Sequence, residues 1–175
     1  MGVGKIDVHD SLVKTKPVPG YEGVYSIRED GAVISLKHGR QLKPQPNSMG
    51  YLRLHSKHNK KRVSLFIHRI LAQVFLGADK EARIDHIDHN PRNNSLSNLR
   101  TCTQSQNLQN ARLRCDNKTG CKGIYFNKRN RNWCAEIKTG YRRIWLGVFP
   151  TKELAVEARR NGESLYHGEF ACSGK

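Results

Sequence analysis

The sequence predicts an α+β chain built from three small units: an N-terminal antiparallel β module, a central unit of strands and helices, and a C-terminal three-stranded sheet packed on one helix. Three observations support this prediction. Short alternating segments are separated by glycine turns before residue 60, an apolar pattern of helical spacing starts near residue 67, and a polar segment begins near residue 114. A chain of 175 residues can form one ordinary domain or several small ones.

The first 16 residues are expected to form an N-terminal extension, and residues 17–60 a small basic β module. Within this module VYSI, AVISL and YLRLHS alternate apolar and polar side chains. The dipeptides Asp30-Gly31, His38-Gly39 and Met49-Gly50 separate the segments, which is typical of hairpin turns. The module is therefore predicted to be a set of short antiparallel strands.

The segment that follows is strongly basic. No acidic residue lies between Asp30 and Asp79, so the basic side chains in that interval are not balanced locally. We expect them to face the phosphates of a nucleic acid, and the alternative is a solvated loop that only keeps the protein soluble. The candidates for DNA contact here are Lys60, Lys61, Arg62 and Arg69.

The run VSLFIHRILAQVFLG begins as a strand and continues as a helix. Its residues Ile67, Ile70, Leu71 and Phe75 recur at helical spacing, and the pattern ends at Gly77. His68 lies at the junction of strand and helix. A histidine in such a place is more often a structural or phosphate-contacting residue than a catalyst, so His68 is a minor candidate.

Residues 83–110, RIDHIDHNPRNNSLSNLRTCTQSQNLQN, hold the densest group of polar side chains that could carry chemistry. The run RIDH is predicted to end a strand, the loop DHNPRNNS is rich in turn-forming residues, and LRTCT is predicted to be the returning strand. A short helix over QSQNLQNARL follows. This order places Asp85 and His86 at a strand end and lets Asn107 project from the helix toward them.

Hydrolysis of a phosphodiester needs an activated water and a cation that offsets the charge on the phosphate. A neutral His86 can accept the proton of the water, since imidazole titrates near physiological pH. Asp85 and Asn107 offer the oxygen ligands that Mg²⁺ or Mn²⁺ prefers. Asn98 can hold the second ring nitrogen of His86 through its side chain or its backbone carbonyl.

The order Asp85-His86, Asn98, Asn107 resembles the HNH endonucleases, in the variant of phage and intron-encoded homing enzymes whose final His is replaced by Asn. The resemblance implies a central ββα-metal unit over residues 61–113, with His86 as general base and Asn98 orienting it. Asp85 and Asn107 would then be the metal ligands. The segment PGYEGVYSIREDGAVISLK is similar to the small module that often precedes such nucleases, and IHRILAQVF matches the helix leading into their active site.

Other interpretations of this stretch remain open. Asp-His pairs and Asn-rich loops are common turn chemistry, and we expect Asp88 and His89 to be loop residues. A structural zinc bound by His86, His89, Cys102 and Cys115 is the alternative metal site, although the spacing is irregular. The chain has five cysteines and no CxxC pair, so reduced thiols are expected rather than a disulfide scaffold.

The C-terminal part is predicted to be independent, with a linker at residues 114–122 and a domain at residues 123–172. The runs GIYF, NWCAEI and RRIWLGVF predict three strands, and KELAVEARRNGESLYHG predicts a helix that begins at Thr151. This pattern resembles the plant ethylene-response-factor type of DNA-binding domain. Its matching positions are Gly123, Trp133, Glu136, Ile137, Trp145, Leu146, Gly147 and Phe149.

In that family the sheet lies in the major groove and the helix packs behind it. The resemblance implies DNA contacts from side chains on and between the strands. A solvated basic sheet edge is the alternative for the charged residues, and core packing is the alternative for either tryptophan. The candidates are Arg129, Arg131, Trp133, Lys138, Arg142, Arg143 and Trp145.

The charge of the chain agrees with a nucleic-acid partner. It contains 31 Lys and Arg against 15 Asp and Glu, a formal charge of +16. No apolar run has the roughly 20 residues of a membrane span, and no secretion signal is evident, so we expect a cytoplasmic protein, in a bacterial host if a phage encodes it.

We therefore predict an endonuclease that depends on a divalent cation, Mg²⁺ or Mn²⁺, and nicks double-stranded DNA at a preferred site. A monomer on DNA is expected, with a dimer as the alternative. The rival predictions are a DNA-binding regulator without catalysis and a basic protein that binds RNA or ribosomes.

Overall fold

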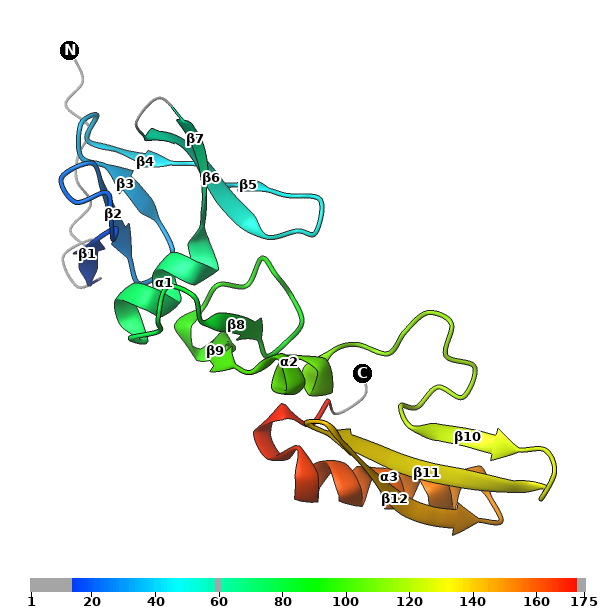
Figure 1. Cartoon of the computed structure of the whole chain (residues 1–175). Helices are drawn as coiled ribbons and strands as arrows, with labels where there is room; N and C mark the ends of the chain where they lie inside the picture. Colours follow the sequence, from blue (N-terminus) through cyan, green and yellow to red (C-terminus); the bar gives the residue numbers. More distant parts are fainter. Residues whose placement is uncertain (1–13, 59–60, 173–175) are drawn as a thin grey trace. The chain divides into compact units, whose positions relative to one another are not determined.

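The computed structural model describes residues 14–58 and 61–172, and it confirms the α+β class through several small antiparallel sheets and short helices (Figure 1). The chain divides into two compact units, Met1–Thr101 and Cys102–Lys175, which are described separately below. In the part of the chain that the structure describes, none of the helices has the length and apolar character needed to cross a membrane.

The first unit contains two small antiparallel sheets. One has the order β1-β2-β3-β4, and its strands are β1 (Thr15–Pro17), β2 (Tyr25–Arg28), β3 (Val33–Ser35) and β4 (Arg40–Leu42). The other has the order β5-β6-β7, with strands β5 (Gln45–Pro46), β6 (Leu52–His58) and β7 (Lys61–Phe66). The glycine turns predicted from the sequence lie between these strands, as expected.

Helix α1 (Ile67–Phe75) begins directly after β7, which confirms the predicted passage from strand to helix. It buries Ile67, Ile70 and Leu71 against residues of both sheets, and the core formed with them includes Val18, Ile27, Val33, Leu54 and Leu99. One core thus takes side chains from both residues 17–60 and residues 61–113, and the β6-β7 hairpin spans the boundary predicted between them. The domain limits themselves stay a prediction.

A two-stranded hairpin completes the first unit. It consists of β8 (Arg83–His86) and β9 (Leu99–Cys102), with the 3-10 turn η2 (Leu96–Asn98) before β9. Leu99 is buried in the core beside α1, so the hairpin is fixed to the helix by apolar packing. This anchors the strand end that carries Asp85 and His86.

The second unit begins with α2 (Gln104–Asn110) and continues with an antiparallel sheet of order β10-β11-β12. Its strands are β10 (Ile124–Asn127), β11 (Asn132–Thr139) and β12 (Arg142–Phe149), and helix α3 (Lys152–Tyr166) and the turn η3 (Gly168–Phe170) follow. Ile124, Ala135 and Ala155 form the core between sheet and α3. The predicted sheet with one packed helix is confirmed, and Thr151 caps α3 through its hydroxyl.

Candidate active site

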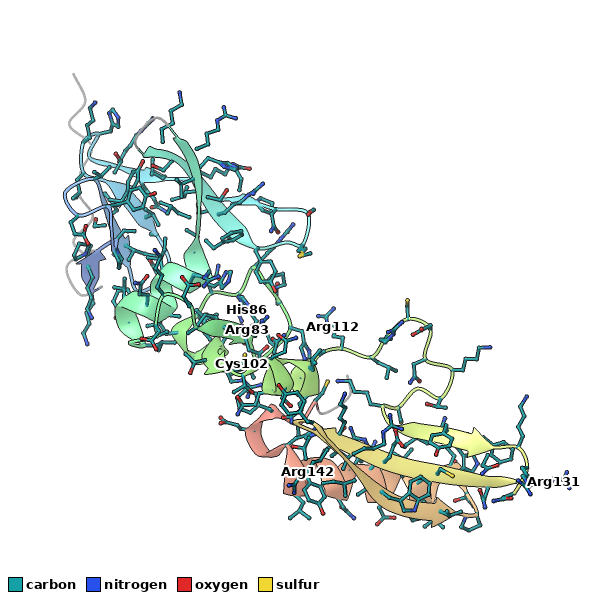
Figure 2. All side chains as sticks on the ribbon, in the orientation of Figure 1. Arg83, His86, Cys102, Arg112, Arg131 and Arg142 are labelled. Atoms are coloured by element: carbon teal, nitrogen blue, oxygen red, sulfur yellow. The ribbon has the colours of Figure 1, made fainter. Side chains whose placement is uncertain are left out.

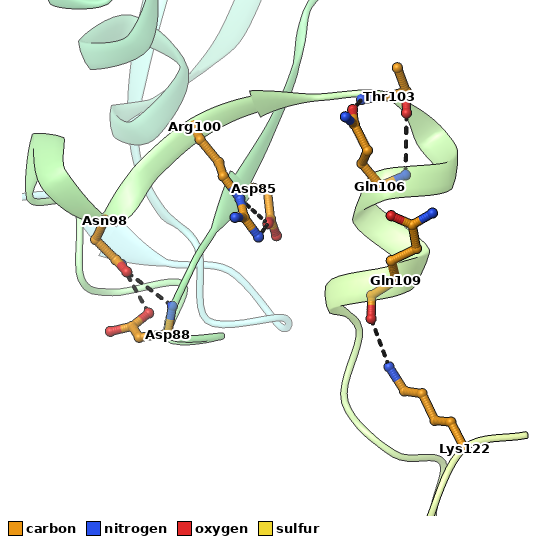
Figure 3. A network of polar contacts seen from close by, with 8 residues as sticks. All are labelled: Asp85, Asp88, Asn98, Arg100, Thr103, Gln106, Gln109 and Lys122. Atoms are coloured by element: carbon orange, nitrogen blue, oxygen red, sulfur yellow. Dashed lines mark hydrogen bonds and ion pairs between the residues drawn. The ribbon is translucent and has the colours of Figure 1, made fainter. Parts of the chain in front are cut away.

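Asp85 and His86 are buried polar residues at the end of β8, only 7% and 6% exposed. Arg100, on the paired strand β9, donates from Nε and Nη2 to Asp85 Oδ2 over 3.0 and 2.9 Å (Figure 3). The buried carboxylate is therefore compensated by a cation across the hairpin, as a buried charge requires. The pairing also fixes the direction of the Asp85 side chain.

The His86 ring is held by a side-chain amide and by aromatic neighbours. His86 Nε2 lies 3.1 Å from Asn94 Oδ1, and both residues are buried. The ring centroids of Tyr51 and His68 lie 5.7 and 5.2 Å from that of His86. This contact fixes the plane of the ring, and which of the two groups donates depends on the tautomer of His86. Asn94 thus orients the imidazole.

His68 is the buried neighbour of His86 at the start of α1. Burial, together with the nearby charges of His86 and Arg69, lowers the pKa of His68 from 6.5 to about 4. A neutral His68 therefore packs edge-on against His86 over the working pH range. In the structure His68 therefore lies in the candidate site, beside His86, which its position in the sequence did not indicate.

Asn98 organises the loop that connects β8 to β9. Its Oδ1 accepts from the backbone N–H of Asp88 at 3.0 Å, and its Nδ2 donates to Asp88 Oδ1 at 2.9 Å (Figure 3). Nδ2 also donates to the carbonyl of Asn93 at 2.8 Å. Its own carbonyl accepts from the N–H of Ile87 at 3.0 Å. The side chain of Asn98 is thus committed to the loop rather than to His86, and a contact of its carbonyl with His86 stays a prediction.

Asp88 and His89 are loop residues, as the sequence predicted. Burial would raise the pKa of Asp88, but hydrogen bonds from Asn93, Asn90 and Asn98 outweigh it and the pKa is lowered. His89 adopts a positive φ of 59°, typical of a tight turn. The described residues contain no group of three or more His, Cys, Asp and Glu side chains placed to hold a metal, so they give the alternative zinc site no support.

Asn107 lies in the middle of α2, in the second unit. A capping box starts this helix: Thr103 Oγ1 accepts from the N–H of Gln106 at 3.2 Å, and the N–H of Thr103 donates to Gln106 Oε1 at 2.7 Å (Figure 3). The structure therefore brings Asp85, His86 and Asn98 together in the first unit. The role of Asn107 as a metal ligand stays a prediction from the sequence.

The basic candidates of the first unit are only partly covered by the structure. Arg62 and Arg69 are exposed, and Arg69 Nη2 donates to the carbonyl of Lys80 at 2.7 Å. Lys60 lies outside the described residues, as does the side chain of Lys61. Arg62 in β7 and Arg69 in α1 thus remain the candidates for phosphate contact that the structure describes in full.

The sheet of the second unit presents a mixed aromatic and basic face. Trp145 pairs with Glu136 and Arg143 with Lys138 across β11 and β12, and Trp145 is 52% exposed. Trp133 packs instead at the core beside Phe126, with ring centroids 5.2 Å apart. Arg129 lies at the turn between β10 and β11. Figure 2 shows Arg131 at the same turn and Arg142 at the start of β12. The exposed members of this group suit DNA contact better than Trp133.

Sequence reasoning missed three residues of the site: Asn94, Arg100 and Tyr51. Asn94 is one of several Asn residues in a loop that was interpreted as turn chemistry. Arg100 is 15 positions from Asp85 and becomes its partner only through the hairpin. The signal for Arg100 was the predicted pairing of the two strands, β8 and β9, because a strand pair can juxtapose an acidic and a basic side chain.

Two family models match the chain. One describes an HNH endonuclease and matches residues 65–109, which include β8, β9 and the loop between them. The other describes the NUMOD4 motif and matches residues 16–56, which cover the first small sheet except for Thr15. The resemblance of residues 123–172 to ethylene-response-factor domains stays a prediction.

Three of the similar proteins come from bacteriophages. DNA endonuclease I-HmuI of Bacillus phage SP01 is 38% identical over 96 residues, which are 54% of this chain and 55% of that protein. H-N-H endonuclease F-TflII of Escherichia phage T5 is 35% identical over 53% of this chain and 49% of its own length. Protein 3.8 of Escherichia phage T7 is 40% identical over half of this chain and 72% of its own length.

A solved structure is also similar. The structure titled "DNA binding and cleavage by the HNH homing endonuclease I-HmuI" matches 55% of this chain and 56% of its own, with 37% identity and a TM-score of 0.51. The chain thus spans about half the length of I-HmuI and of F-TflII.

Proposed function

The chain belongs to the HNH endonuclease family through residues 65–109, and on that premise we propose that it is a metal-dependent endonuclease that nicks double-stranded DNA at a preferred site. The observation that carries the proposal is the buried pair Asp85 and His86, held by Arg100 and Asn94 at one strand end inside the matched segment. Buried polar residues that are held by side-chain hydrogen bonds are more typical of a functional site than of a turn.

In the proposed reaction His86 accepts a proton from the water that attacks the phosphodiester. Asn94 and the rings of Tyr51 and His68 hold the imidazole in place, so it does not need to reorient when DNA binds. Asn98 supports the same geometry from the loop side, through the hydrogen bonds that shape residues 87–98 and through its carbonyl.

The donor set fits a hard divalent cation. An ionised carboxylate has about four lone-pair sites, so Asp85 can accept from Arg100 and still bind a cation. Asn107 would supply an amide oxygen, and such oxygens suit Mg²⁺ or Mn²⁺. When bound, the cation offsets negative charge on the phosphate and on the leaving oxygen.

DNA would be held by basic and aromatic side chains of both units. We propose Arg62 and Arg69 in the first unit, with Lys60 and Lys61 as the sequence predicts. In the second unit the exposed residues Lys138, Arg142, Arg143 and Trp145 and the turn residues Arg129 and Arg131 would contact the duplex. Trp133 would act there mainly by supporting the sheet from its core side.

The activity is tested with supercoiled plasmid and with DNA from the source genome, because a site-specific enzyme can miss an arbitrary plasmid. We expect conversion to open-circle DNA with Mg²⁺ or Mn²⁺ and none with EDTA. The assay reads the topological state of the DNA on a gel, so it separates a nick from a double-strand break.

Three other outcomes would contradict the proposal. Cleavage that persists in EDTA would contradict the metal requirement. Tight DNA binding without cleavage in either metal would favour the regulator, and stronger competition by RNA than by duplex DNA would favour an RNA-binding role. The cytoplasmic location and the monomeric state on DNA remain predictions of the sequence.

A further inference from the structure

The sheet of the second unit has one face toward α3 and an outer face turned away from that helix. Ala135 of β11 and Leu146 of β12 pack with Ala155 of the helix, and Ile137 is buried on the same side. Because successive side chains of a strand alternate between its faces, the other positions of β11 and their partners on β10 and β12 form the outer face. This outer face includes Tyr125, Glu136, Lys138, Arg143, Trp145 and Val148.

A bulge in β12 brings two apolar side chains together on the outer face. The register with β11 shifts at Leu146, which is an extra residue between the pairs on either side. Regular alternation would place Trp145 and Val148, three positions apart, on opposite faces of the sheet. With the extra residue both lie on the outer face, opposite Glu136 and Cys134.

The outer face therefore carries a strip of exposed apolar surface, made of Tyr125, Trp145 and Val148. Tyr125 and Val148 lie on either side of Cys134, which is buried. Tyr125 is 43% exposed, Val148 is 51% exposed and Trp145 is similarly accessible. Large apolar side chains that are exposed together on one face are typical of an interaction surface.

Cations beside the apolar strip indicate that the partner is a polyanion. Lys138 and Arg143 form a cross-strand pair on the outer face, and the side chain of Arg143 is 71% exposed. Arg143 Nη1 donates to Glu136 Oε2 at 3.4 Å, which limits the directions that the guanidinium can take. A guanidinium has five N–H donors, so Arg143 can keep this contact and still bind a phosphate.

The shape of the sheet and the chemistry of its outer face suit the major groove of duplex DNA. Strands β11 and β12 have eight residues each and form an antiparallel ribbon, an element that the major groove admits. Base edges in that groove present hydrogen-bonding groups and one large apolar group, the C5-methyl of thymine. The carbon atoms of the apolar strip make no hydrogen bonds, so they gain most from burial against that methyl group.

We propose that the outer face selects thymine in the major groove, with Trp145, Val148 and Tyr125 packing on its C5-methyl group. Lys138 and Arg143 contact phosphates beside it and position the sheet, while the apolar strip reads the base. The inference rests on the proposed function for its partner, duplex DNA. It does not require cleavage, so it can be tested without a divalent metal.

The test is an electrophoretic mobility shift of the full chain with two labelled duplexes, in EDTA and at one salt concentration. One duplex alternates adenine and thymine, and the other alternates adenine and uracil. They have the same charge and the same hydrogen-bonding groups, and they differ in the C5-methyl group. We expect the uracil duplex to bind about fourfold more weakly or worse, the loss of one buried methyl group.

Matched variants assign the preference to the outer face. Val148→Ser should bind the thymine duplex as weakly as the native chain binds the uracil duplex. Leu165→Ser changes an exposed apolar residue of α3 and should keep the native preference. Arg143→Gln should weaken binding to both duplexes by the same factor, because it removes charge and not the apolar contact. Thermal melting of each variant shows that it is folded.

The outcomes separate this inference from the proposed nuclease. Equal binding of the two duplexes by the native chain would overturn it, as would a preference that is unchanged in Val148→Ser or lost in Leu165→Ser. A thymine preference without nicking in the plasmid assay would support the inference and contradict the nuclease. Nicking with equal binding of the two duplexes would do the reverse.

Discussion

The ion pair between Asp85 and Arg100 stabilises the candidate site at the level of single residues. The carboxylate and the guanidinium are both largely excluded from solvent and are joined by two hydrogen bonds to one oxygen. Burial of an isolated charge lowers the stability of the fold, and each partner of this pair offsets that effect for the other. The same pairing leaves carboxylate lone pairs for a cation.

The first prediction concerns this pair. Arg100→Gln should lower the free energy of unfolding by about 3 kcal/mol, because it removes the cation from a buried carboxylate. Urea unfolding followed by circular dichroism measures the change. Adding Asp85→Asn should recover part of the loss, since the uncompensated charge is then gone.

The control is Arg92→Gln, which changes an exposed arginine in the neighbouring loop. Its effect should stay within about 0.5 kcal/mol. Equal stability of Arg100→Gln and native protein would show that the ion pair does not support the site.

The second prediction concerns His68 and pH. Its pKa is about 4 in the folded chain and 6.5 ordinarily. Between these values the unfolded chain binds a proton that the folded chain does not, so stability falls as the pH falls from 6.5 to 4. The contribution of His68 is fully present above pH 6.5, and about 3 kcal/mol is lost by linkage once the pH has fallen to 4.

His68→Phe keeps a neutral ring beside His86 and removes the titration. Unfolding measured at a series of pH values should therefore show a shallower fall for this variant than for the native chain between pH 6.5 and 4. Identical slopes would mean that His68 is protonated as easily in the folded chain as in the unfolded one.

At the level of secondary structure, the close approach of backbone segments decides which positions tolerate a side chain. Gly123 precedes β10 with φ +64°, and its carbonyl accepts from the N–H of Glu136 at 2.8 Å. A Cβ there would collide with the Glu136 carbonyl and lie 3.1 Å from Arg159 Nε. Gly140, between β11 and β12, has φ +57° but no atom within 4 Å of its Cβ position.

The third prediction compares these two glycines. Both alanine substitutions carry the cost of the left-handed backbone, about 1 kcal/mol. Gly123→Ala should be less stable than Gly140→Ala by about 2 kcal/mol or more, because the strand must also move. Both tryptophans, Trp133 and Trp145, lie in the second unit, so their fluorescence during urea unfolding reports on it. Equal losses would contradict the close contact at Gly123.

Local patterns predicted the elements well. The alternating runs and their glycine turns predicted the small sheets, and helical spacing after Phe66 predicted α1, because both signals depend on neighbouring residues only. The shared core of the first unit was not predicted. Its contacts join Val18 and Ile27 to Leu99, and no local pattern specifies such distant partners.

The site was predicted in part for the same reason. Asp85 and His86 stand together in the sequence, and their chemistry is visible there. The choice of Asn94 as the partner of His86 Nε2 depends on the path of the loop, and the contacts of Tyr51 and His68 depend on the packing of β6 and α1 against the hairpin. These are tertiary contacts, so composition could not select them.

Over the whole molecule, charge and family membership lead to the same partner. The formal charge of +16 favours a polyanion, and phage endonucleases are among the similar proteins. Charge alone would suit any nucleic-acid-binding protein. The catalytic assignment is what separates this account from a binding protein.

The most direct test of that assignment measures binding and cleavage of one labelled duplex from the source genome by His86→Ala. The control is His89→Asn, which changes the loop histidine of positive φ to a residue that tolerates this conformation. We expect His86→Ala to bind the duplex with native affinity and to leave it uncut, and His89→Asn to bind and nick it at a rate near that of the native chain. Native cleavage by His86→Ala, or loss of binding together with cleavage, would contradict the role of His86 as general base.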